Sequence, residues 1–430
     1  MILVRRFTLA DQLENRHPTV AFEVPAGVDS FEVRLDFDRS RAVVDLGCEA
    51  PSGAFEQTWR GWSGGARDRF VIGRDRATPG YLPGLTAGTW QVVLGLHRLA
   101  AATDPRSPFT RHADPLEVQI EVVIPAESHL ADEPLAPVTP APRGSGRRLP
   151  AADGLTWFAG DLHAHTTHSD GSLSIDQLAA TAALRGLDFL AVTDHNTTCH
   201  HAHLPASAAR HGLSLIPGQE VTTHRGHANA FGDISWVDFR RPAEAWVAQV
   251  ATSGGLLSVN HPIQDDCAWQ HPLTAPPPLL EFWHISGFLD QTATGAWAFW
   301  RQWREASRAR GLPDPILIGG SDFHTPEQGY PPGTPTTWVA AEDSSVDALM
   351  AGIAAGRVAI SRFPTPGEPV MVRLGDHLAV IDGDGCVVID EDGRGHLVRG
   401  DRWTTPAPGR QGSGGVVRLE GADRTLLAVC

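Results

Sequence analysis

Residues 161–197 read DLHAHTTHSDGSLSIDQLAATAALRGLDFLAVTDHNT, in which two short apolar segments flank an amphipathic one. Ser174 and Gln177 have the spacing of a capping box, so a helix is expected to begin at Ser174. The apolar run at 189–195 then predicts a buried strand. A His-x-His pair closes the first strand, and an Asp-His pair closes the second. The stretch therefore predicts a strand–helix–strand unit with polar side chains at its strand ends.

The same alternation continues downstream. Helices are expected near 242–252 and 294–309, between further apolar runs. Near-continuous apolar strands that alternate with helices are typical of a parallel sheet covered on both faces, open or closed into a barrel. The expected strands are LSLIPGQE (213–220), LLSVNHP (256–262), LLEFWHIS (279–286) and PILIGGSDFH (315–324).

Regions with β-type patterns flank this α/β segment. Short alternating runs separated by Gly- and Pro-rich turns predict a β-sandwich-like domain at the start of the chain. A Pro- and Ala-rich stretch then predicts an extended linker, in which Arg147 and Arg148 are expected to be solvated. The end of the chain returns to short strands and Asp-Gly turns. The expected parts are therefore 1–125 (β-sandwich-like), 126–152 (linker), 153–365 (α/β) and 366–430 (a small β extension).

Composition excludes several classes of protein. The chain is 42% hydrophobic and 20% charged, which is ordinary for a soluble globular protein. Its net charge of −15 argues against a nucleic-acid surface. None of its 35 basic residues is a lysine, which excludes a lysine Schiff base and a P-loop. The five cysteines form no C-x-x-C pair, so neither a disulfide scaffold nor a thiolate zinc site is expected.

The chain is expected to be cytoplasmic and to bind no membrane. No run approaches the ~18 apolar residues of a membrane helix, and the first residues lack the apolar core of a signal peptide. The expected partner is a small molecule. The sequence leaves open whether the chain forms a homo-oligomer.

Histidines are concentrated in the α/β segment, where 14 of the 20 lie between His163 and His324. In parallel α/β folds the carboxyl ends of the strands share one face, so residues at five strand ends are expected to meet at one mouth. Glu281 and His284 point to the same mouth and are expected to support the ligands. The candidate ligands are His163, His165, Asp170, His195, Glu220, His261, Asp322 and His324.

These residue types indicate metal binding. In a His-x-His pair at a strand end both imidazoles point the same way and can reach one ion. Imidazoles with carboxylates and no thiolate suit Zn²⁺, Mn²⁺ or Fe²⁺. Because one ion takes three or four protein ligands, this set predicts two or three ions, and a carboxylate such as that of Glu220 can bridge two of them.

The run 161–197 resembles the opening motifs of the PHP family, the polymerase and histidinol phosphatase metal-dependent phosphoesterases. PGQEVTT (217–223), VNHP (259–262) and GGSDFH (319–324) are similar to the remaining motifs of that family, in its order. The resemblance covers roughly residues 155–362 and implies a distorted (β/α)7 barrel with two or three ions of Mn, Fe or Zn. The amino-terminal motifs GWSGGAR and TPGYLPGLTAGTW resemble the carbaryl-hydrolase-like (CehA/McbA-type) branch.

By motif, the resemblance implies a ligand set for each ion. The first ion is assigned to His163, His165, Glu220 and Asp322. The second is assigned to Glu220, His261 and His227. The third is assigned to His195 and His324, with Asp170 as a ligand or as an acid/base. Asp170 is a departure from those members that place a histidine in this loop.

The prediction that follows is a metal-dependent hydrolase, favoured as a phosphoesterase acting on a small phosphorylated metabolite by attack of metal-bound hydroxide. Asp170 or His195 is expected to protonate the leaving oxygen, and Arg225 to grip the phosphate. Two alternatives stay open. One is metal-dependent hydrolysis of a carboxyl ester, carbamate or amide, for which Trp269, Trp283 and Trp297 can line an aryl cleft. The other is a non-catalytic, metal-stabilised binding module.

Overall fold

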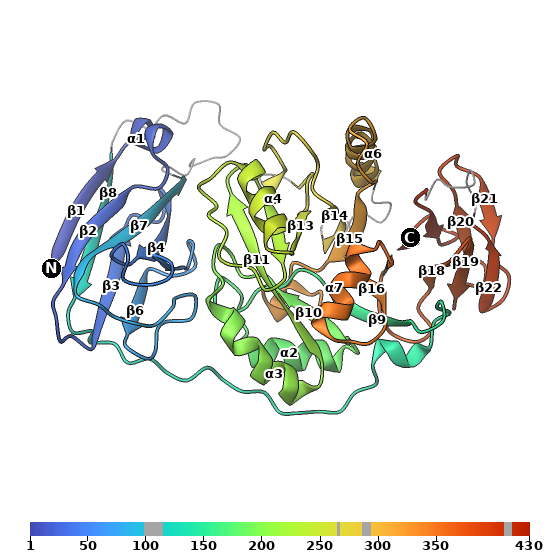
Figure 1. Cartoon of the computed structure of the whole chain (residues 1–430), viewed down its shortest axis with the longest axis horizontal. Helices are drawn as coiled ribbons and strands as arrows, with labels where there is room; N and C mark the ends of the chain where they lie inside the picture. The colour runs from blue at the N-terminus through green and yellow to red at the C-terminus, as the bar shows by residue number, and fades with distance from the viewer. Residues whose placement is uncertain (99–114, 265–266, 286–293, 408–414) are drawn as a thin grey trace. The chain divides into compact units, whose positions relative to one another are not determined.

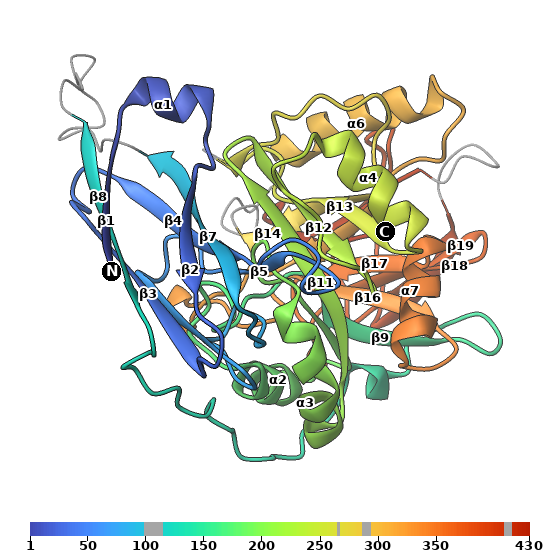
Figure 2. The ribbon, with the colours of Figure 1, turned by 60° about the vertical axis from the view of Figure 1, so that its left-hand side comes forward.

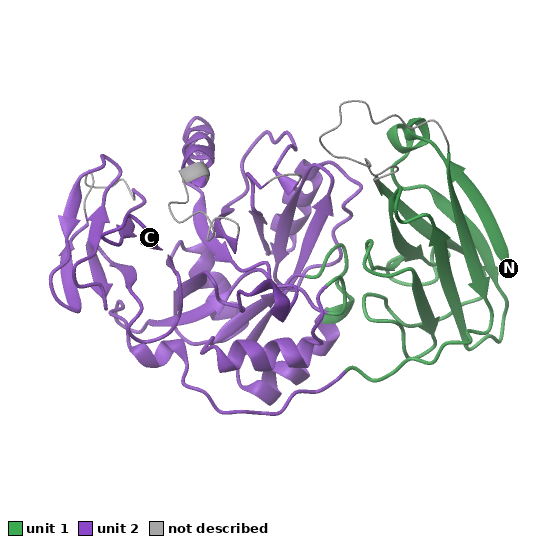
Figure 3. Cartoon of the chain, turned by 180° about the vertical axis from the view of Figure 1, so that it is seen from behind, with its two compact units in different colours: residues 1–133, 167–170, 194–200 green, residues 134–166, 171–193, 201–430 purple. Residues whose placement is uncertain are grey.

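The computed structural model describes residues 1–98, 115–264, 267–285, 294–407 and 415–430. These residues divide into two compact units (Figure 3). Unit 1 comprises residues 1–133, 167–170 and 194–200, and unit 2 comprises residues 134–166, 171–193 and 201–430. Two short loops from the α/β segment of the sequence therefore belong to the same unit as the amino-terminal β region.

Unit 1 is rich in antiparallel sheet. One four-stranded sheet has the order β1 (Ile2–Phe7), β8 (Leu116–Val123), β3 (Ser30–Phe37) and β6 (Arg69–Gly73). The other has the order β2 (Thr19–Val24), β7 (Gly88–Arg98), β4 (Val43–Glu49) and β5 (Trp59–Trp62). Strand β2 alternates exposed and buried residues, as a strand with one face in a core must. Phe31 of the first sheet contacts Phe22 and Trp90 of the second at ring-centroid distances of 5.1 and 4.9 Å, so the two sheets share one core.

Unit 2 is a mixed α/β structure built on a 13-stranded sheet (Figure 1). Strands β9, β10 and β11 run parallel, as do β13, β14 and β15. In order across the sheet the strands are β15 (Ile316–Gly320), β14 (Leu279–His284), β13 (Leu256–Val259), β12 (Gly226–Phe231), β11 (Ser214–Thr223), β10 (Phe189–Val192), β9 (Thr156–Asp161), β16 (Thr336–Ala341), β17 (Val358–Ser361), β24 (Leu426–Val429), β23 (Arg418–Glu420), β20 (Val387–Ile389) and β21 (Gly395–Leu397).

The expectation of a wholly parallel sheet is wrong. Strand β12 pairs antiparallel with both β11 and β13, because a tight turn after Thr223 reverses the chain at once. Strand β16 is antiparallel to β9. The closed barrel is not confirmed either, since no strand ladder joins β15 to β16 within the described ranges. Instead, the hydroxyl of Thr337 on β16 accepts from the N–H of Gly319 on β15 (2.9 Å) and donates to its carbonyl (2.7 Å).

Helices of unit 2 begin and end largely where local sequence signals lie. Helix α2 (Ile175–Leu184) has the predicted capping box between Ser174 and Gln177. Helices α4 (Ala243–Thr252) and α6 (Thr294–Arg308) confirm the two downstream predictions. Helices α3 (Leu204–His211) and α7 (Val346–Ala354) were not anticipated. Helix α3 packs against α2 and β11 (Figure 2).

Arg147 and Arg148 were both expected to be solvated, and only Arg148 is. Arg148 is exposed, but the Arg147 side chain is only 4% exposed and lies 2.7 Å from Asp382 Oδ2. The Arg147 guanidinium also donates to the carbonyl of Glu368 at 2.7 Å. This arginine thus docks the short 3-10 helix Gly144–Arg147 onto the carboxyl-terminal region.

That carboxyl-terminal region forms a three-stranded sheet in the order β18 (Val370–Leu374), β19 (His377–Ile381) and β22 (Arg402–Pro406). Its remaining strands extend the main sheet, because β24 pairs with β17. Within the described residues of the whole chain, no helix has the length and apolar character that a membrane crossing requires.

Candidate metal centre

The polar residues at the strand ends of unit 2 meet as a buried cluster. His163 Nε2 lies 3.3 Å from Glu220 Oε1 and 3.2 Å from Asp322 Oδ1. His165 Nε2 lies 3.0 Å from the same Asp322 oxygen and 3.5 Å from Glu220 Oε2. Ligands held about 2.1 Å from one ion are themselves roughly 3–3.5 Å apart. Each of the two histidines therefore lies at such a distance from both carboxylates.

Glu220 also takes part in a second cluster. Its Oε1 lies 3.2 Å from His227 Nδ1 and 3.3 Å from His261 Nε2. His227 stands on the unexpected strand β12, directly opposite Thr222 on β11, which brings it beside Glu220. Because one oxygen of Glu220 approaches imidazoles of both clusters, this carboxylate lies where it could bridge two ions, and the bridging role stays a prediction.

Carboxylates and histidines behind the clusters orient the ligands. Glu281 Oε1 lies 2.9 Å from His163 Nδ1, which leaves Nε2 of that imidazole facing Glu220 and Asp322. His284 Nε2 lies 3.0 Å from Asp322 Oδ2. Both residues therefore contact candidate ligands, and their supporting role stays a prediction. Such outer partners fix the tautomer and direction of a ligating imidazole.

Two supporting residues were missed by the sequence analysis. Asp161 is fully buried; its Oδ1 accepts from the backbone N–H of His163 (3.1 Å) and Ser321 (3.0 Å), and its Oδ2 accepts from Gly333 (2.7 Å). Asn260 donates from Nδ2 to Glu220 Oε1 at 2.9 Å. Their only sequence signal is that they stand one or two residues before ligands in the DLHAH and VNHP motifs.

Neighbouring groups of opposite charge shift the pKa values of this cluster, upward for a histidine and downward for an aspartate. Burial alone would lower the pKa of His163, but three neighbouring carboxylates raise it well above its ordinary value; they belong to Asp322, Glu281 and Glu220. Burial favours the neutral form of Asp322, but the histidines around it, His163 foremost, hold its pKa well below the ordinary value. Without a cation, therefore, protons on imidazoles balance the buried carboxylates.

These residues fit a divalent cation. His163 Nε2 is buried and makes no hydrogen bond, although two carboxylate oxygens lie close to it. A buried nitrogen without a hydrogen bond is uncommon and needs an explanation, such as an ion. A donor set of imidazole nitrogens and carboxylate oxygens is the one that Zn²⁺, Mn²⁺ and Fe²⁺ take. Asp322 (φ 50°) and His261 (φ 25°) also have left-handed backbone, a strained conformation for residues other than glycine that recurs at functional sites.

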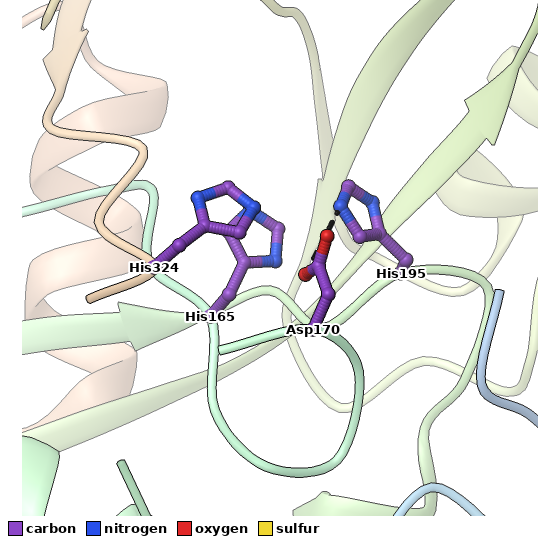
Figure 4. Close-up of side chains that lie close together, drawn as sticks. All are labelled: His165, Asp170, His195 and His324. Carbon is purple, nitrogen blue, oxygen red and sulfur yellow. Dashed lines mark ion pairs between the residues drawn. The ribbon is translucent and has the colours of Figure 1, made fainter. Parts of the chain in front are cut away.

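The residues assigned to the third ion form two pairs, one in each unit (Figure 4). In unit 1, His195 Nε2 lies 3.5 Å from Asp170 Oδ1. In unit 2, the rings of His165 and His324 stack with centroids 4.1 Å apart. His324 Nδ1 lies 2.8 Å from the carbonyl oxygen of Asp322, so its Nε2 faces away from that carbonyl.

The remaining candidates lie outside these clusters. Arg225 is exposed on the turn between β11 and β12, and its guanidinium donates to the carbonyl of Gln270 at 2.8 Å. Trp283 is buried in the core of unit 2, and Trp297 packs against Phe282 at 4.6 Å. Trp269 lines a cavity of about 230 Å³ together with His271, Phe299 and Trp303.

Comparison with known proteins agrees with this chemistry. Residues 161–262 match the model of the PHP domain. Over 65 residues, 15% of this chain, the sequence is 45% identical to the 5'-3' exoribonuclease Rnm of Escherichia coli, in a match covering 22% of that protein. Over 66 residues, also 15% of this chain, it is 41% identical to the 3',5'-nucleoside bisphosphate phosphatase of Chromobacterium violaceum, covering 23% of that protein. The chain thus matches less than a quarter of the length of these relatives.

A solved structure is also similar. It is a two-domain protein from Bacteroides vulgatus containing a predicted PHP-like metal-dependent phosphoesterase. The match has a TM-score of 0.38 and 19% sequence identity, and it covers 69% of this chain and 99% of that one. Residues 161–262 thus match a PHP domain, and most of the His, Asp and Glu groups that could hold a metal ion lie within that range.

Proposed function

We propose that this protein is a phosphoesterase that hydrolyses a small phosphorylated molecule. The observation that carries the proposal is the buried Nε2 of His163, which faces the carboxylates of Glu220 and Asp322 and makes no hydrogen bond. The relatives that match the PHP segment are named for a phosphatase and an exoribonuclease, both of which break phosphate esters. A net charge of −15 favours a small substrate over RNA for this chain.

The ligands are assigned as the motifs imply. The first ion takes His163, His165, Glu220 and Asp322. The second takes Glu220, His227 and His261. The third takes Asp170, His195 and His324. Divalent ions, when bound, lower the pKa of water and neutralise charge on phosphoryl oxygens.

The chain's own residues supply proton transfer and substrate orientation. His195 Nε2 and Asp170 Oδ1 lie 3.5 Å apart, and we assign to this pair the proton that goes to the leaving oxygen. We assign Arg225 to the phosphate of the substrate. A guanidinium has five N–H donors, so Arg225 can keep its bond to Gln270 while it binds phosphate.

Two finer assignments belong to the same proposal. The hydrogen bonds between Gly319 and Thr337 support closure of the sheet into a (β/α)7 barrel through β15 and β16. The amino-terminal motifs support the carbaryl-hydrolase-like branch, whose chemistry would be hydrolysis of a carboxyl ester or carbamate. The aromatic cavity at Trp269 favours that second function for an aryl substrate.

The test compares two reactions on one preparation. Protein purified without chelator is assayed for metal content and for hydrolysis of 4-nitrophenyl phosphate and 4-nitrophenyl acetate. We expect two or three ions per chain and phosphate release that His163→Ala and Asp322→Ala abolish. His377→Ala is the matched control, because His377 is exposed on β19 and outside the clusters. Cleavage of the acetate alone would replace the proposal by the second function, and less than one ion with no turnover after Mn²⁺ is added would refute both.

A further inference from the structure

Two loops that follow strands of the PHP segment fold with the amino-terminal β region. Residues 167–170 and 194–200 belong to unit 1 together with residues 1–133 (Figure 3, green). Asp170 is the last residue of one loop, and His195 is the second residue of the other. By contrast, Asp161 of unit 2 accepts from the backbone N–H of His163 and from that of Ser321, the residue before Asp322. The contacts of the two loops therefore decide where Asp170 and His195 stand.

Residues 1–133 hold the first loop by its backbone and by a buried histidine. The N–H of Gly80 donates to His168 Nδ1 at 3.2 Å, and the other ring nitrogen of His168 lies 3.3 Å from Glu133 Oε2. Thr167 Oγ1 donates to Glu133 Oε1 at 2.7 Å, and Arg67 donates to the Thr167 carbonyl. His168 is 3% exposed, so its hydrogen bond from Gly80 is shielded from water.

The second loop is held from the same β region. Trp59 on β5 is 2% exposed and donates from Nε1 to the carbonyl of Asn196 at 3.1 Å. Asn196 follows His195 directly and has left-handed backbone (φ 53°). Thr197 Oγ1 donates to the carbonyl of Gly80 at 3.1 Å. The backbone that follows His195 is thereby held by two hydrogen bonds to residues of the amino-terminal β region.

Gly80 contacts both loops at once. Its N–H bonds the first loop and its carbonyl accepts from the second. A Cβ on Gly80 would stand 2.6 Å from the carbonyl oxygen of His168, and the residue has φ +97°, so no other residue fits without displacing the loop. Ser169 Oγ also donates to Asp194 Oδ1 at 2.6 Å, which ties the two loops together beside Asp170 and His195.

We propose that the amino-terminal β domain is a positioning element for Asp170 and His195, acting through Trp59, Gly80 and Glu133. The inference rests on the proposed function in one respect, the assignment of Asp170 and His195 as ligands of the third ion. Ligands on loops need such support, because a metal site tolerates displacements of only about 0.5 Å. The domain has this task in addition to burying its own core.

The first test variant is Trp59→Phe, which removes the indole N–H and keeps an aromatic ring in the core. Thr197→Val is the second and removes the other hydrogen bond to the 194–200 loop. Trp90→Phe is the matched control, because Trp90 is a fully buried tryptophan of the same unit whose Nε1 donates to the carbonyl of Thr86, away from both loops. His195→Ala gives the reference for loss of the third ion.

Two readouts are taken, amide hydrogen exchange of peptides spanning 167–170 and 194–200, and Mn²⁺ bound per chain. We expect faster exchange of these peptides in Trp59→Phe and Thr197→Val, and roughly tenfold weaker binding of the ion that His195→Ala loses, as outer-shell changes usually cause. Exchange of peptides that contain His163 and Glu220 should stay unchanged. Trp90→Phe should match the wild type in both readouts.

The inference is overturned if both variants bind Mn²⁺ as Trp90→Phe does, whether or not their loops exchange faster. It is also overturned if His195→Ala itself retains every ion of the wild type. Absence of phosphate hydrolysis in the wild type would refute the proposed reaction, but the exchange and metal readouts would still decide the positioning role.

Discussion

Glu281 joins two candidate ligands, His163 and His261, that follow different strands. Its Oε1 lies 2.9 Å from His163 Nδ1, and its Oε2 accepts from the backbone N–H of His261 at 2.7 Å. His163 belongs to the first cluster and His261 to the second. One buried carboxylate therefore sets the direction of an imidazole in one cluster and the backbone position of a ligand in the other.

Glu281→Gln should weaken metal binding without removing a ligand. The amide keeps one acceptor oxygen, so it can serve His163 or His261 but not both. We expect a 10- to 100-fold loss of affinity for the first two ions, the usual effect of a lost outer-shell partner. Competition with a chromogenic chelator measures it. Glu305→Gln, an exposed position on α6, is the control and should bind as the wild type does.

Metal binding should release protons. Carboxylates raise the pKa of His163 well above its ordinary value, so this imidazole is protonated in the metal-free protein at neutral pH. A ligating imidazole must give up that proton, so metal affinity should fall as pH is lowered. Calorimetric titration with Mn²⁺ in two buffers of different ionisation enthalpy gives the number released. Heats that do not depend on the buffer would contradict the prediction.

The metal-free protein should lose stability at both ends of the pH range. The raised pKa of His163 gives stability that is complete below about pH 6.5 and is lost as pH rises through the raised value. The lowered pKa of Asp322 gives stability that is complete above about pH 4 and is lost as pH falls. Thermal melts of chelator-treated protein should therefore show the highest Tm between these limits. A Tm that increases steadily into the alkaline range would contradict this.

Asp161→Asn should destabilise the fold as well as the site. The carboxylate accepts three backbone N–H groups, and an amide in its place would direct N–H against N–H at one of them. We expect a loss of about 2–3 kcal/mol in the free energy of unfolding, the cost of a buried donor left unpaired. Urea unfolding measures it. The exposed Asp153→Asn is the matched control and should change stability little.

Arg147→Ala tests whether the segment before β9 is docked rather than a free linker. Its guanidinium is buried against Asp382 and the carbonyl of Glu368. We expect a loss of about 1–3 kcal/mol in unfolding free energy, because a charge-assisted hydrogen bond is removed. Arg148→Ala changes the exposed neighbour and should leave stability within about 0.5 kcal/mol. Equal effects of the two variants would contradict the docking.

Much of the cluster could be predicted from the sequence, because each apolar run ends in a histidine or a carboxylate. His163 and His165 are two residues apart, and Glu220, His261 and Asp322 each end an apolar run, so parallel strands bring them together. The capping box of α2 is equally local.

Local sequence patterns do not predict which distant segments pair or contact one another. Strand β12 was not predicted, because its pairing with β11 depends on the turn between them. That antiparallel pairing is what brings His227 beside Glu220. The roles of Asp161 and Asn260 depend on backbone N–H groups and carboxylates far away in the chain. The burial of Arg147 depends on an acidic residue 235 positions later.

The geometry of Glu220 has a consequence for how ions enter and leave. A single oxygen, Oε1, lies 3.3 Å from His163 Nε2, 3.2 Å from His227 Nδ1 and 3.3 Å from His261 Nε2. An ion at either cluster would withdraw charge from the oxygen that the other cluster also needs, and its departure would return that charge to the remaining ion. Occupancy of the two sites would therefore be linked, and gradual chelation should deplete them one after the other rather than as one cooperative step.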